Sequence, residues 1–245
     1  MSKIFNNKIT LPKCRNCNGD GWQRDFANQI IQVGNVDQHC YCYYANKFLE
    51  ASIGFDYWEI EPNTYQGDPE DLAQVVKYFN KINEMKNQGR GFYIYGPNYG
   101  TGKSTLAVMW LKHILTTTNF SCLFVPFSEL VILNTKLING SFDKTIDTKI
   151  DFIKNVDFLV LDDLAKEYDS QRDNGRATMN ALLRYRDLWC KPTTYTANVP
   201  MTQVADLYGG SNYSIIAGRS ILIDMVNTED FRRTRKIQQL IKERD

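Results

Sequence analysis

A lysine and a serine stand directly after a glycine-rich turn, in the stretch GFYIYGPNYGTGKSTL at residues 91–106. A short apolar strand at 92–95 precedes the turn, and an apolar helix that runs past Trp110 follows it. Strand, glycine-rich turn, Gly-Lys-Ser and helix form the layout of a phosphate-binding loop, or P-loop. Glycine is needed because successive backbone N–H groups must approach phosphate oxygens, and side chains would block them. The stretch predicts that Lys103 contacts the β- and γ-phosphates of a nucleotide and that the Ser104 hydroxyl binds Mg²⁺.

The spacing within this loop departs by one residue from the usual pattern, which places four residues between the first glycine and Gly-Lys-Ser/Thr. Counted back from Gly102, that first position is Pro97, and Gly96 lies one residue earlier. Either the loop is one residue longer or Pro97 opens it. The alternative is a glycine-rich turn that binds nothing. We expect the cofactor-binding segment to comprise Gly96, Pro97, Asn98, Tyr99, Gly100, Thr101, Gly102, Lys103, Ser104 and Thr105.

Two carboxylates close an apolar run downstream, in the stretch VDFLVLDDLAKEY. A continuous apolar run such as 158–161 is typical of a buried parallel strand, and α/β sheets bind ligands at the carboxyl ends of their strands. We expect Asp162 to hold Mg²⁺ through water, and Asp163 or Glu167 to polarise the attacking water. Two aspartates after a strand are a weak signal alone, but about sixty residues after a P-loop they become a strong one.

A β-branched strand at 193–197 ends in an amide side chain, Asn198. The amide could hydrogen-bond the γ-phosphate or the attacking water. It could equally cap a helix expected at 200–207, and the spacing alone does not choose between the two.

Four of the six cysteines form two pairs near the N-terminus. Cys14 and Cys17 stand in CRNCNGDGW, and Cys40 and Cys42 stand in HCYC. Four thiolates would complete a tetrahedral structural Zn²⁺ site, and the metal would supply folding energy that so short a segment cannot gain from apolar burial. An iron–sulfur cluster, a disulfide and free thiols are the alternatives, and His39 could replace one thiolate.

Composition limits the class of protein. The 29 basic and 28 acidic residues give a formal charge of +1, which argues against a broad nucleic-acid-binding field but not against a local basic groove. No stretch approaches the roughly 18 apolar residues that span a membrane, and the N-terminus lacks the apolar core of a signal peptide. We therefore expect a cytoplasmic protein whose cysteines are reduced or metal-bound.

Periodicity predicts the remaining elements. Apolar stretches at 122–127 and 220–225 predict two further strands, and helical spacing over 68–85 predicts a helix with Asp68 as its N-cap. The further helices that we expect lie at 43–51, 128–137, 176–188 and 229–244.

In their order, these motifs resemble the AAA+ ATPases of the DnaC/DnaI helicase-loader group, with the transposition regulator IstB as a close relative. The matching pieces are GFYIYGPNYGTGKSTLA, VDFLVLDDLAKE, RYRDLWCKPTTYTANVP, LYGGSNYSIIAGRS and EDFRR. The N-terminal CRNCNGDGW…CYC looks like the zinc module of phage and Gram-positive members. The resemblance implies an α/β fold, with a P-loop AAA+ parallel sheet flanked by helices. It divides the chain into a zinc-binding partner-interaction module at 1–53, a linker at 54–67 and an AAA+ ATPase domain at 68–245.

The resemblance also assigns catalytic roles. Many AAA+ proteins have glutamate at the second Walker B position, and the shorter Asp163 would slow hydrolysis. For Arg219 and Arg232, a surface salt bridge is the alternative to a catalytic role. The matching positions are Lys103 and Ser104 for Walker A, Asp162 and Asp163 for Walker B, Asn198 for sensor 1, Arg219 for an arginine finger acting in trans, and Arg232 for the sensor 2 arginine in cis.

For function, the resemblance implies an ATP- and Mg²⁺-dependent loader of a hexameric, DnaB-type replicative helicase onto single-stranded DNA during replication initiation. Such a protein would assemble with copies of itself, and its ATPase would be slow and stimulated by partner or DNA. One alternative is an IstB-like transposition ATPase that binds DNA and recruits a transposase. Others are an ATP-binding adaptor with little hydrolysis and, more distantly, a metal-binding DNA adaptor.

Overall fold

The computed structural model describes residues 29–30, 32–33, 36–37, 40–138, 144–165 and 172–225 of the 245-residue chain. At 32–33, 36–37, 41–42 and 172 it describes the backbone alone. Several predicted features lie outside the described residues, and they stay predictions: Cys14, Cys17, the Cys42 side chain, His39, Glu167, Arg232 and the helix at 229–244.

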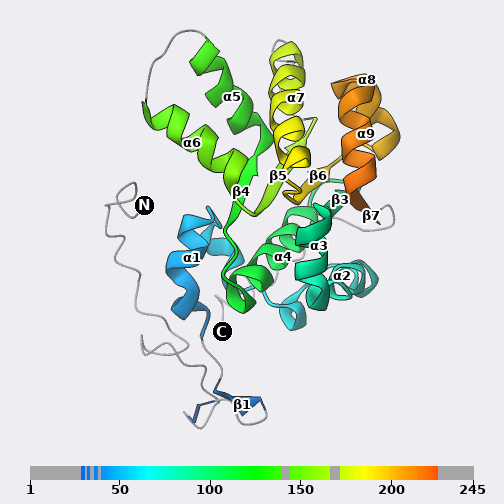
Figure 1. Ribbon diagram of the computed structural model, residues 1–245. Coiled ribbons are helices and arrows are strands. Elements are labelled where there is room, and N and C mark those ends of the chain that lie inside the picture. Colours follow the sequence, from blue (N-terminus) through cyan, green and yellow to red (C-terminus); the bar gives the residue numbers. More distant parts are fainter. Residues whose placement is uncertain are drawn as a thin grey trace, which may run out of the picture.

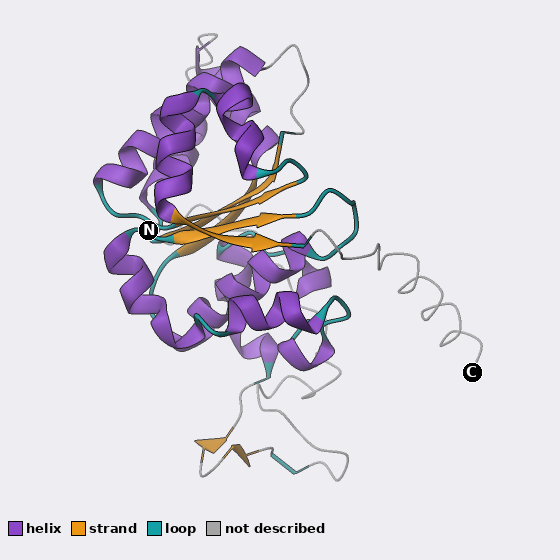
Figure 2. Ribbon diagram, turned by 90° about the vertical axis from the view of Figure 1, so that its right-hand side faces the viewer, coloured by secondary structure: helices purple, strands orange, loops and turns teal. Residues whose placement is uncertain are grey.

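Within the described residues, five parallel strands form one sheet in the order β4-β5-β6-β3-β7. Helices cover both of its faces (Figure 2). The strand that leads into the P-loop, β3, lies between β6 and β7, and the strand with the two aspartates, β5, lies beside β6. The sheet strands are β3 (Gly91–Tyr95), β4 (Cys122–Pro126), β5 (Phe158–Leu164), β6 (Thr193–Ala197) and β7 (Ser220–Asp224).

The helices fall into two groups, one for each face of the sheet (Figure 1). The first group is α1 (Ala45–Glu50), α2 (Pro69–Val76), α3 (Ile82–Gln88) and α4 (Lys103–Thr117). The second is α5 (Phe127–Ile138), α6 (Lys144–Asn155), α7 (Arg172–Leu188), α8 (Val204–Tyr208) and α9 (Gly210–Arg219). Short 3-10 turns lie at Tyr41–Tyr44, Phe55–Tyr57, Pro62–Thr64, Phe79–Lys81 and Met201–Gln203, and β1 (Gln32–Val33) pairs antiparallel with β2 (Val36–Asp37).

Alternation along the strands produces the two packed layers. Phe92 and Ile94 of β3 join the core that α4 covers, whereas Tyr93 between them joins the core on the opposite face. Successive side chains of a strand point to opposite faces, so a strand buried on both faces reads as a continuous apolar run. The α/β fold class expected from the sequence is therefore confirmed.

The predicted helix at 68–85 is broken in the structure. α2 ends at Val76, and α3 begins at Ile82 after a 3-10 turn. The predicted cap is present, because Asp68 Oδ1 accepts a hydrogen bond of 2.8 Å from Glu70 N. The predicted start of the helix is therefore confirmed, whereas the prediction of one continuous helix over 68–85 is wrong.

The described part of residues 40–67 shares a core with the sheet. Phe48 and Trp58 are buried in the cluster that contains α4, and their ring centroids lie 5.8 Å apart. The buried Lys112 of α4 donates to Trp58 O at 2.8 Å and to Ile60 O at 2.6 Å. Burial lowers the pKa of Lys112, an effect that Glu61 opposes. Residues 54–67, expected as a linker, are therefore fixed against α4, and the proposed domain boundaries stay a prediction.

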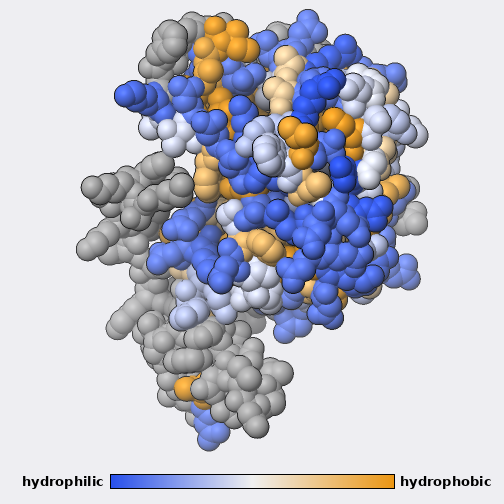
Figure 3. Space-filling view, viewed as in Figure 1, coloured by the Kyte–Doolittle hydropathy of each residue, from blue (hydrophilic) through white to orange (hydrophobic). Residues whose placement is uncertain are grey.

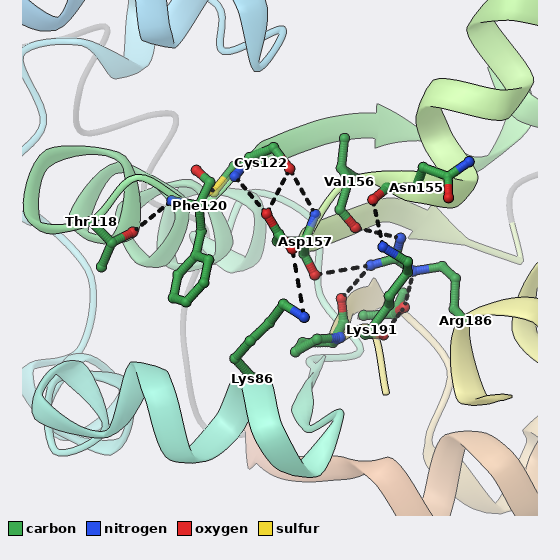
Figure 4. Close-up of polar contacts among 12 residues, drawn as sticks. Lys86, Thr118, Phe120, Cys122, Asn155, Val156, Asp157, Arg186 and Lys191 are labelled. Atoms are coloured by element: carbon green, nitrogen blue, oxygen red, sulfur yellow. Dashed lines mark hydrogen bonds and ion pairs between the residues drawn. The ribbon is translucent and has the colours of Figure 1, made fainter. Parts of the chain in front are cut away.

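A buried arginine fixes the amino ends of two strands (Figure 4). Arg186 of α7 donates to Val156 O at 3.0 Å, to Pro192 O at 2.7 Å and to Thr193 Oγ1 at 2.8 Å. Burial lowers the pKa of Arg186 to about 10, so the guanidinium keeps its charge at neutral pH. These bonds hold the segments that lead into β5 and β6, the strands that end in the candidate site.

Exposed apolar side chains gather along α5, where Ile132, Leu137 and Ile138 reach solvent. Figure 3 shows apolar surface over this helix. Among the described residues, none of the helices combines the length and the apolar character needed to cross a membrane.

Candidate functional site

Left-handed backbone shapes the glycine-rich loop between β3 and α4. Gly100 has φ of 73° and Gly102 has φ of 93°, a region that glycine adopts without strain. A Cβ added at Gly102 would lie 2.9 Å from the Tyr65 hydroxyl. Both conformation and close approach therefore require glycine at position 102, immediately before α4 begins.

The loop closes around its lysine. The Lys103 side chain is buried, and Nζ donates to Gly96 O at 2.9 Å, to Asn98 O at 2.7 Å and to Thr101 Oγ1 at 3.3 Å. The loop thus extends back to Gly96, and its extra residue is accommodated by carbonyls that bond the ammonium group. A cation at the N-terminus of a long helix is the arrangement that attracts phosphate.

The structure brings the loop serine to the first aspartate. Ser104 Oγ donates to Asp162 Oδ1 at 2.7 Å, although the two residues lie on α4 and β5. Thr196 Oγ1 of β6 donates to the same oxygen at 2.6 Å. Hydroxyl and carboxylate oxygens are the ligands that Mg²⁺ prefers. The contact fits the predicted metal role, which itself stays a prediction.

The second aspartate lies in an unusual backbone conformation. Asp163 has φ of 60° and Ala165 has φ of 66°, both in the left-handed region. The backbone N of Asp163 donates to Thr196 Oγ1 at 2.9 Å, and that of Ala165 donates to the Tyr208 hydroxyl at 2.9 Å. Non-glycine residues in this region cost roughly 1–3 kcal/mol and cluster at functional sites.

Asn198 lies between the loop and the two aspartates. The residue before it, Ala197, pairs with Tyr95 of β3 on one side and with Leu164 of β5 on the other. Among the described residues, the buried Asn198 Oδ1 has no hydrogen-bond partner. An unpaired buried acceptor at this edge fits a site that a bound nucleotide and its water complete.

Arg219 is not brought to these residues. It is the last residue of α9, directly before β7, and Nε donates to Asp187 Oδ1 at 2.7 Å while Nη1 donates to Gln88 O at 2.7 Å. Both partners precede strands, so the arginine lies at the amino edge of the sheet. A strand of five residues spans roughly 16 Å, and Arg219 therefore lies across the sheet from the P-loop of its own chain.

No role was assigned to Thr196 or to Tyr65 from the sequence, although the structure places both beside the site. The Tyr65 hydroxyl is buried against Gly102 and has no hydrogen-bond partner among the described residues. Burial raises the pKa of Tyr65, and Asp71 and Asp68 raise it further. Thr196 lies two residues before Asn198, on the same face of the strand as Thr194, but the sequence does not distinguish its hydroxyl from those of the neighbouring threonines.

The predicted zinc site is not tested by the described residues. Cys40 is buried, and its three proposed co-ligands fall outside the described side chains. In the part of the chain that the structure describes, no group of three or more His, Cys, Asp or Glu side chains could hold a metal ion.

No family model matches the chain. The replicative helicase loader DnaI of Bacillus subtilis (strain 168) is 30% identical over 135 residues, which are 54% of this chain and 41% of DnaI. The uncharacterized protein YqaM of the same strain is 22% identical over 139 residues and is covered to 42%. The chain thus spans about two fifths of the length of the curated relatives it matches.

Solved structures of helicase loaders are also similar to the chain. A crystal structure of the DnaC helicase loader matches 70% of this chain and 99% of its own, with a TM-score of 0.59 and 25% identity. A crystal structure of DnaI matches 65% and 85%, with a TM-score of 0.53 and 26% identity. AMPPCP-bound DnaA from Aquifex aeolicus matches 76% and 55%, with a TM-score of 0.51, and at 18% identity it shows the fold alone. The chain is therefore a homologue of the DnaI and DnaC helicase loaders and has the fold of the AAA+ P-loop ATPases.

Proposed function

We propose that the chain is an ATPase that loads a hexameric, DnaB-type replicative helicase onto single-stranded DNA during replication initiation. The names of its relatives, helicase loaders, support the biological role. The observation that carries the chemistry is the contact between Ser104 and Asp162 beside the loop that encloses Lys103. These groups meet at the carboxyl edge of a parallel sheet, where α/β folds bind ligands.

The chain's own residues have separable tasks in this proposal. When bound with Mg²⁺, ATP would supply the γ-phosphoryl group, and the transfer of this group to water would drive helicase loading. Lys103, which bonds loop carbonyls in the structure, would bind the β- and γ-phosphate oxygens, and Ser104 and Asp162 would hold Mg²⁺. Asp163 orients the attacking water, and Asn198 Oδ1 accepts a hydrogen bond from it.

Arg219 acts in trans in this proposal. It lies across the sheet from its own P-loop, so it reaches a γ-phosphate only in a neighbouring copy of the chain. Its bonds to Asp187 and to Gln88 O hold it at the surface of the single chain. A head-to-tail contact of this kind generates a ring or a helical arc. Arg232 would act in cis as sensor 2.

We assign the proposed partners to the three parts of the chain that the resemblance implies. The zinc-binding module at 1–53 would hold the helicase, and the ATPase domain at 68–245 would contact single-stranded DNA in the cytoplasm. Residues 54–67 would join the two while packed against α4. A DnaA initiator has been determined bound to AMPPCP and single-stranded DNA, which supports a DNA contact on this fold. Zn²⁺ at Cys14, Cys17, Cys40 and Cys42 belongs to the proposal.

Two measurements test the proposed function. The tagged chain should retain its host's replicative helicase in the presence of ATP, and single-stranded DNA should raise phosphate release, both lost in Lys103→Ala. Retention of a transposase instead of a helicase would support the IstB-like alternative and overturn the loader proposal.

A second candidate is an ATP-binding adaptor with little hydrolysis. The observation that favours it is Asp163, which is shorter than glutamate and lies in left-handed backbone at a register shift in β5. Tight ATP binding without phosphate release, even with helicase and DNA present, would support this candidate.

A further inference from the structure

The strand that carries the two aspartates is irregular where they occur. Between two regular pairs with β6, Asp162 and Asp163 lie opposite the single residue Thr196, which is the arrangement of a β-bulge. A bulge removes a backbone donor from the ladder and redirects side chains. Since Asp163 also has φ of 60°, neighbouring contacts must hold the bulge in place.

The Thr196 side chain supplies two such contacts. Its Oγ1 accepts from the backbone N of Asp163 at 2.9 Å and donates to Asp162 Oδ1 at 2.6 Å. The directions are fixed, because a backbone N–H only donates and a carboxylate oxygen only accepts. The side chain is fully buried, so water does not replace either bond. A hydroxyl can serve both partners at once, and an aliphatic side chain of similar shape can serve neither.

We propose that Thr196 is a positioning residue for Mg²⁺, whose hydroxyl fixes the bulge and keeps Asp162 in place beside Ser104. This inference rests on the proposed nucleotide-binding function and deepens it. Ser104 Oγ donates to the same Asp162 oxygen at 2.7 Å in the structure. If Ser104 held Mg²⁺ through its hydroxyl, the bond from Thr196 would still fix the Asp162 carboxylate.

Thr196 also links two parts of the site. It lies two residues before Asn198 on β6, so one strand carries both the hydroxyl that bonds the Asp162 carboxylate and the amide that we propose for the attacking water. Partners that orient metal ligands from behind typically change metal affinity by about 10- to 100-fold when they are removed.

Three variants of the full chain separate this role from ordinary strand stability. Thr196→Val removes the hydroxyl, and Thr196→Ser keeps it. Thr194→Val is the matched control, since Thr194 is also buried on β6 and its Oγ1 accepts from Phe92 N at 3.2 Å, on the side of β3. Thr196→Ala replaces the valine variant if that variant does not fold.

The first measurement is amide hydrogen exchange of the nucleotide-free protein, which requires no activity. Peptides that cover residues 158–165 should exchange faster in Thr196→Val, because the Asp163 N–H loses its acceptor. Thr196→Ser and Thr194→Val should leave the exchange of these peptides as in the wild type. Unchanged exchange in Thr196→Val would overturn the inference.

The second measurement is the Mg²⁺ concentration that half-saturates calorimetric ATP binding. This Mg²⁺ concentration should be about 10- to 100-fold higher in Thr196→Val than in the wild type. It should be close to the wild-type value in Thr196→Ser and unchanged in Thr194→Val. ATP binding in EDTA should be equal in all variants. An unchanged Mg²⁺ requirement in Thr196→Val, or an equal rise in Thr194→Val, would overturn the inference and leave the proposed function intact. A wild-type chain that binds no ATP would overturn the proposed function and the inference together.

Discussion

At the scale of single residues, the site contains both hydrogen-bonded groups and a buried amide oxygen that has no partner among the described residues. Lys103 and Ser104 bond within the site, whereas the buried Asn198 Oδ1 has no partner in the described part of the chain. A buried acceptor left unpaired costs about 1–3 kcal/mol. The protein therefore carries a local cost in the nucleotide-free state that a bound ligand would relieve.

Replacing Asn198 should change the rate of phosphate release without lowering the stability of the nucleotide-free protein. Asn198→Ala should leave the nucleotide-free protein as stable as the wild type or more so, because the unpaired acceptor is removed. Phosphate release should fall by about 100-fold, the usual effect of removing one preorganised polar group from a reaction site. Thermal melting and phosphate release, measured beside the matched variant Asn180→Ala on α7, check both effects. Lower stability with an unchanged rate would show that Asn198 is a structural cap.

The contact between Ser104 and Asp162 could be predicted from sequence, because a P-loop fixes the serine in the first turn of its helix and parallel strands end at one edge. The role of Thr196 could not. A threonine in a β-branched strand is what sheet propensity alone would place there. Only the bulge at Asp163, which leaves a backbone donor without a ladder partner, makes its hydroxyl distinctive.

At the scale of elements, polar groups fix the amino ends of the strands that carry the site. Arg186 bonds the segments before β5 and β6, and Asp157 joins the beginnings of β4 and β5 through Ser121. Lys86 of α3 lies 3.5 Å from the Asp157 carboxylate (Figure 4). The carboxyl ends of the strands can therefore remain irregular while their amino ends are held.

Removal of the arginine should destabilise the whole domain. Arg186→Met keeps much of the buried volume and leaves the carbonyls of Val156 and Pro192 without this donor. We expect a loss of at least about 3 kcal/mol, since each buried group deprived of a charged partner costs about 1–3 kcal/mol. Chemical denaturation measures it, with exposed Arg184→Met as the control. A loss no larger than that of the control would contradict this account.

Asp157 should contribute a pH-dependent part of stability. Although burial alone would raise its pKa, hydrogen bonds from Ser121 and the nearby Lys86 hold the pKa of Asp157 below its ordinary value of 3.8. Folding therefore favours the ionised form, and this contribution is present above the ordinary pKa and is lost as the pH falls through the lower folded value. Asp157→Asn should be less stable by about 1 kcal/mol at pH 7, and the difference should narrow in acid. Denaturation at several pH values tests this, and a constant difference would contradict it.

The strands were predictable because their apolar runs are continuous, and β6 matches the expected 193–197 at both ends. Two helices were missed. α6 lies in a stretch for which no element was predicted from the sequence, and only Ile153 is buried along it. α9 begins with Gly210, Ser211 and Asn212, residues typical of turns, and its helical state follows from packing against the sheet.

At the scale of the whole molecule, the two edges of the sheet carry complementary parts of one proposed site. The P-loop and the aspartates lie at the carboxyl edge, and Arg219 lies at the amino edge with Asp187. One chain alone cannot bring them together, so hydrolysis should depend on assembly.

Mixing two inactive variants tests this dependence. Lys103→Ala lacks the lysine proposed to bind phosphate, and Arg219→Ala lacks the proposed arginine finger, whose removal should lower hydrolysis by about 1000-fold or more. Their mixture should recover activity, because a Lys103→Ala chain can supply Arg219 to the intact P-loop of an Arg219→Ala chain. The test is to measure phosphate release from each variant alone and from the mixture, at equal total concentration. A mixture no more active than its components would contradict action in trans.

The N-terminal part was predictable only as a pattern of cysteines. The sequence suggested a separate module up to residue 53, yet Phe48 and Ala51 are packed in the core beneath α4. Burial by a distant helix is a tertiary effect that local spacing does not encode. The core that contains α1 and α4 therefore includes residues upstream of 68, where the resemblance places the start of the ATPase domain, and the domain boundaries stay a prediction.

The measurement that most directly tests the central claim is calorimetric titration of the intact chain with ATP in the presence of Mg²⁺. The account predicts saturable binding that weakens by about 10- to 100-fold in Lys103→Ala, the effect of losing a charged hydrogen bond of about 1.5–3 kcal/mol. Lys149→Ala, an exposed lysine on α6, should bind as the wild type does. Absence of binding by the wild-type chain, or equal binding by Lys103→Ala, would contradict it.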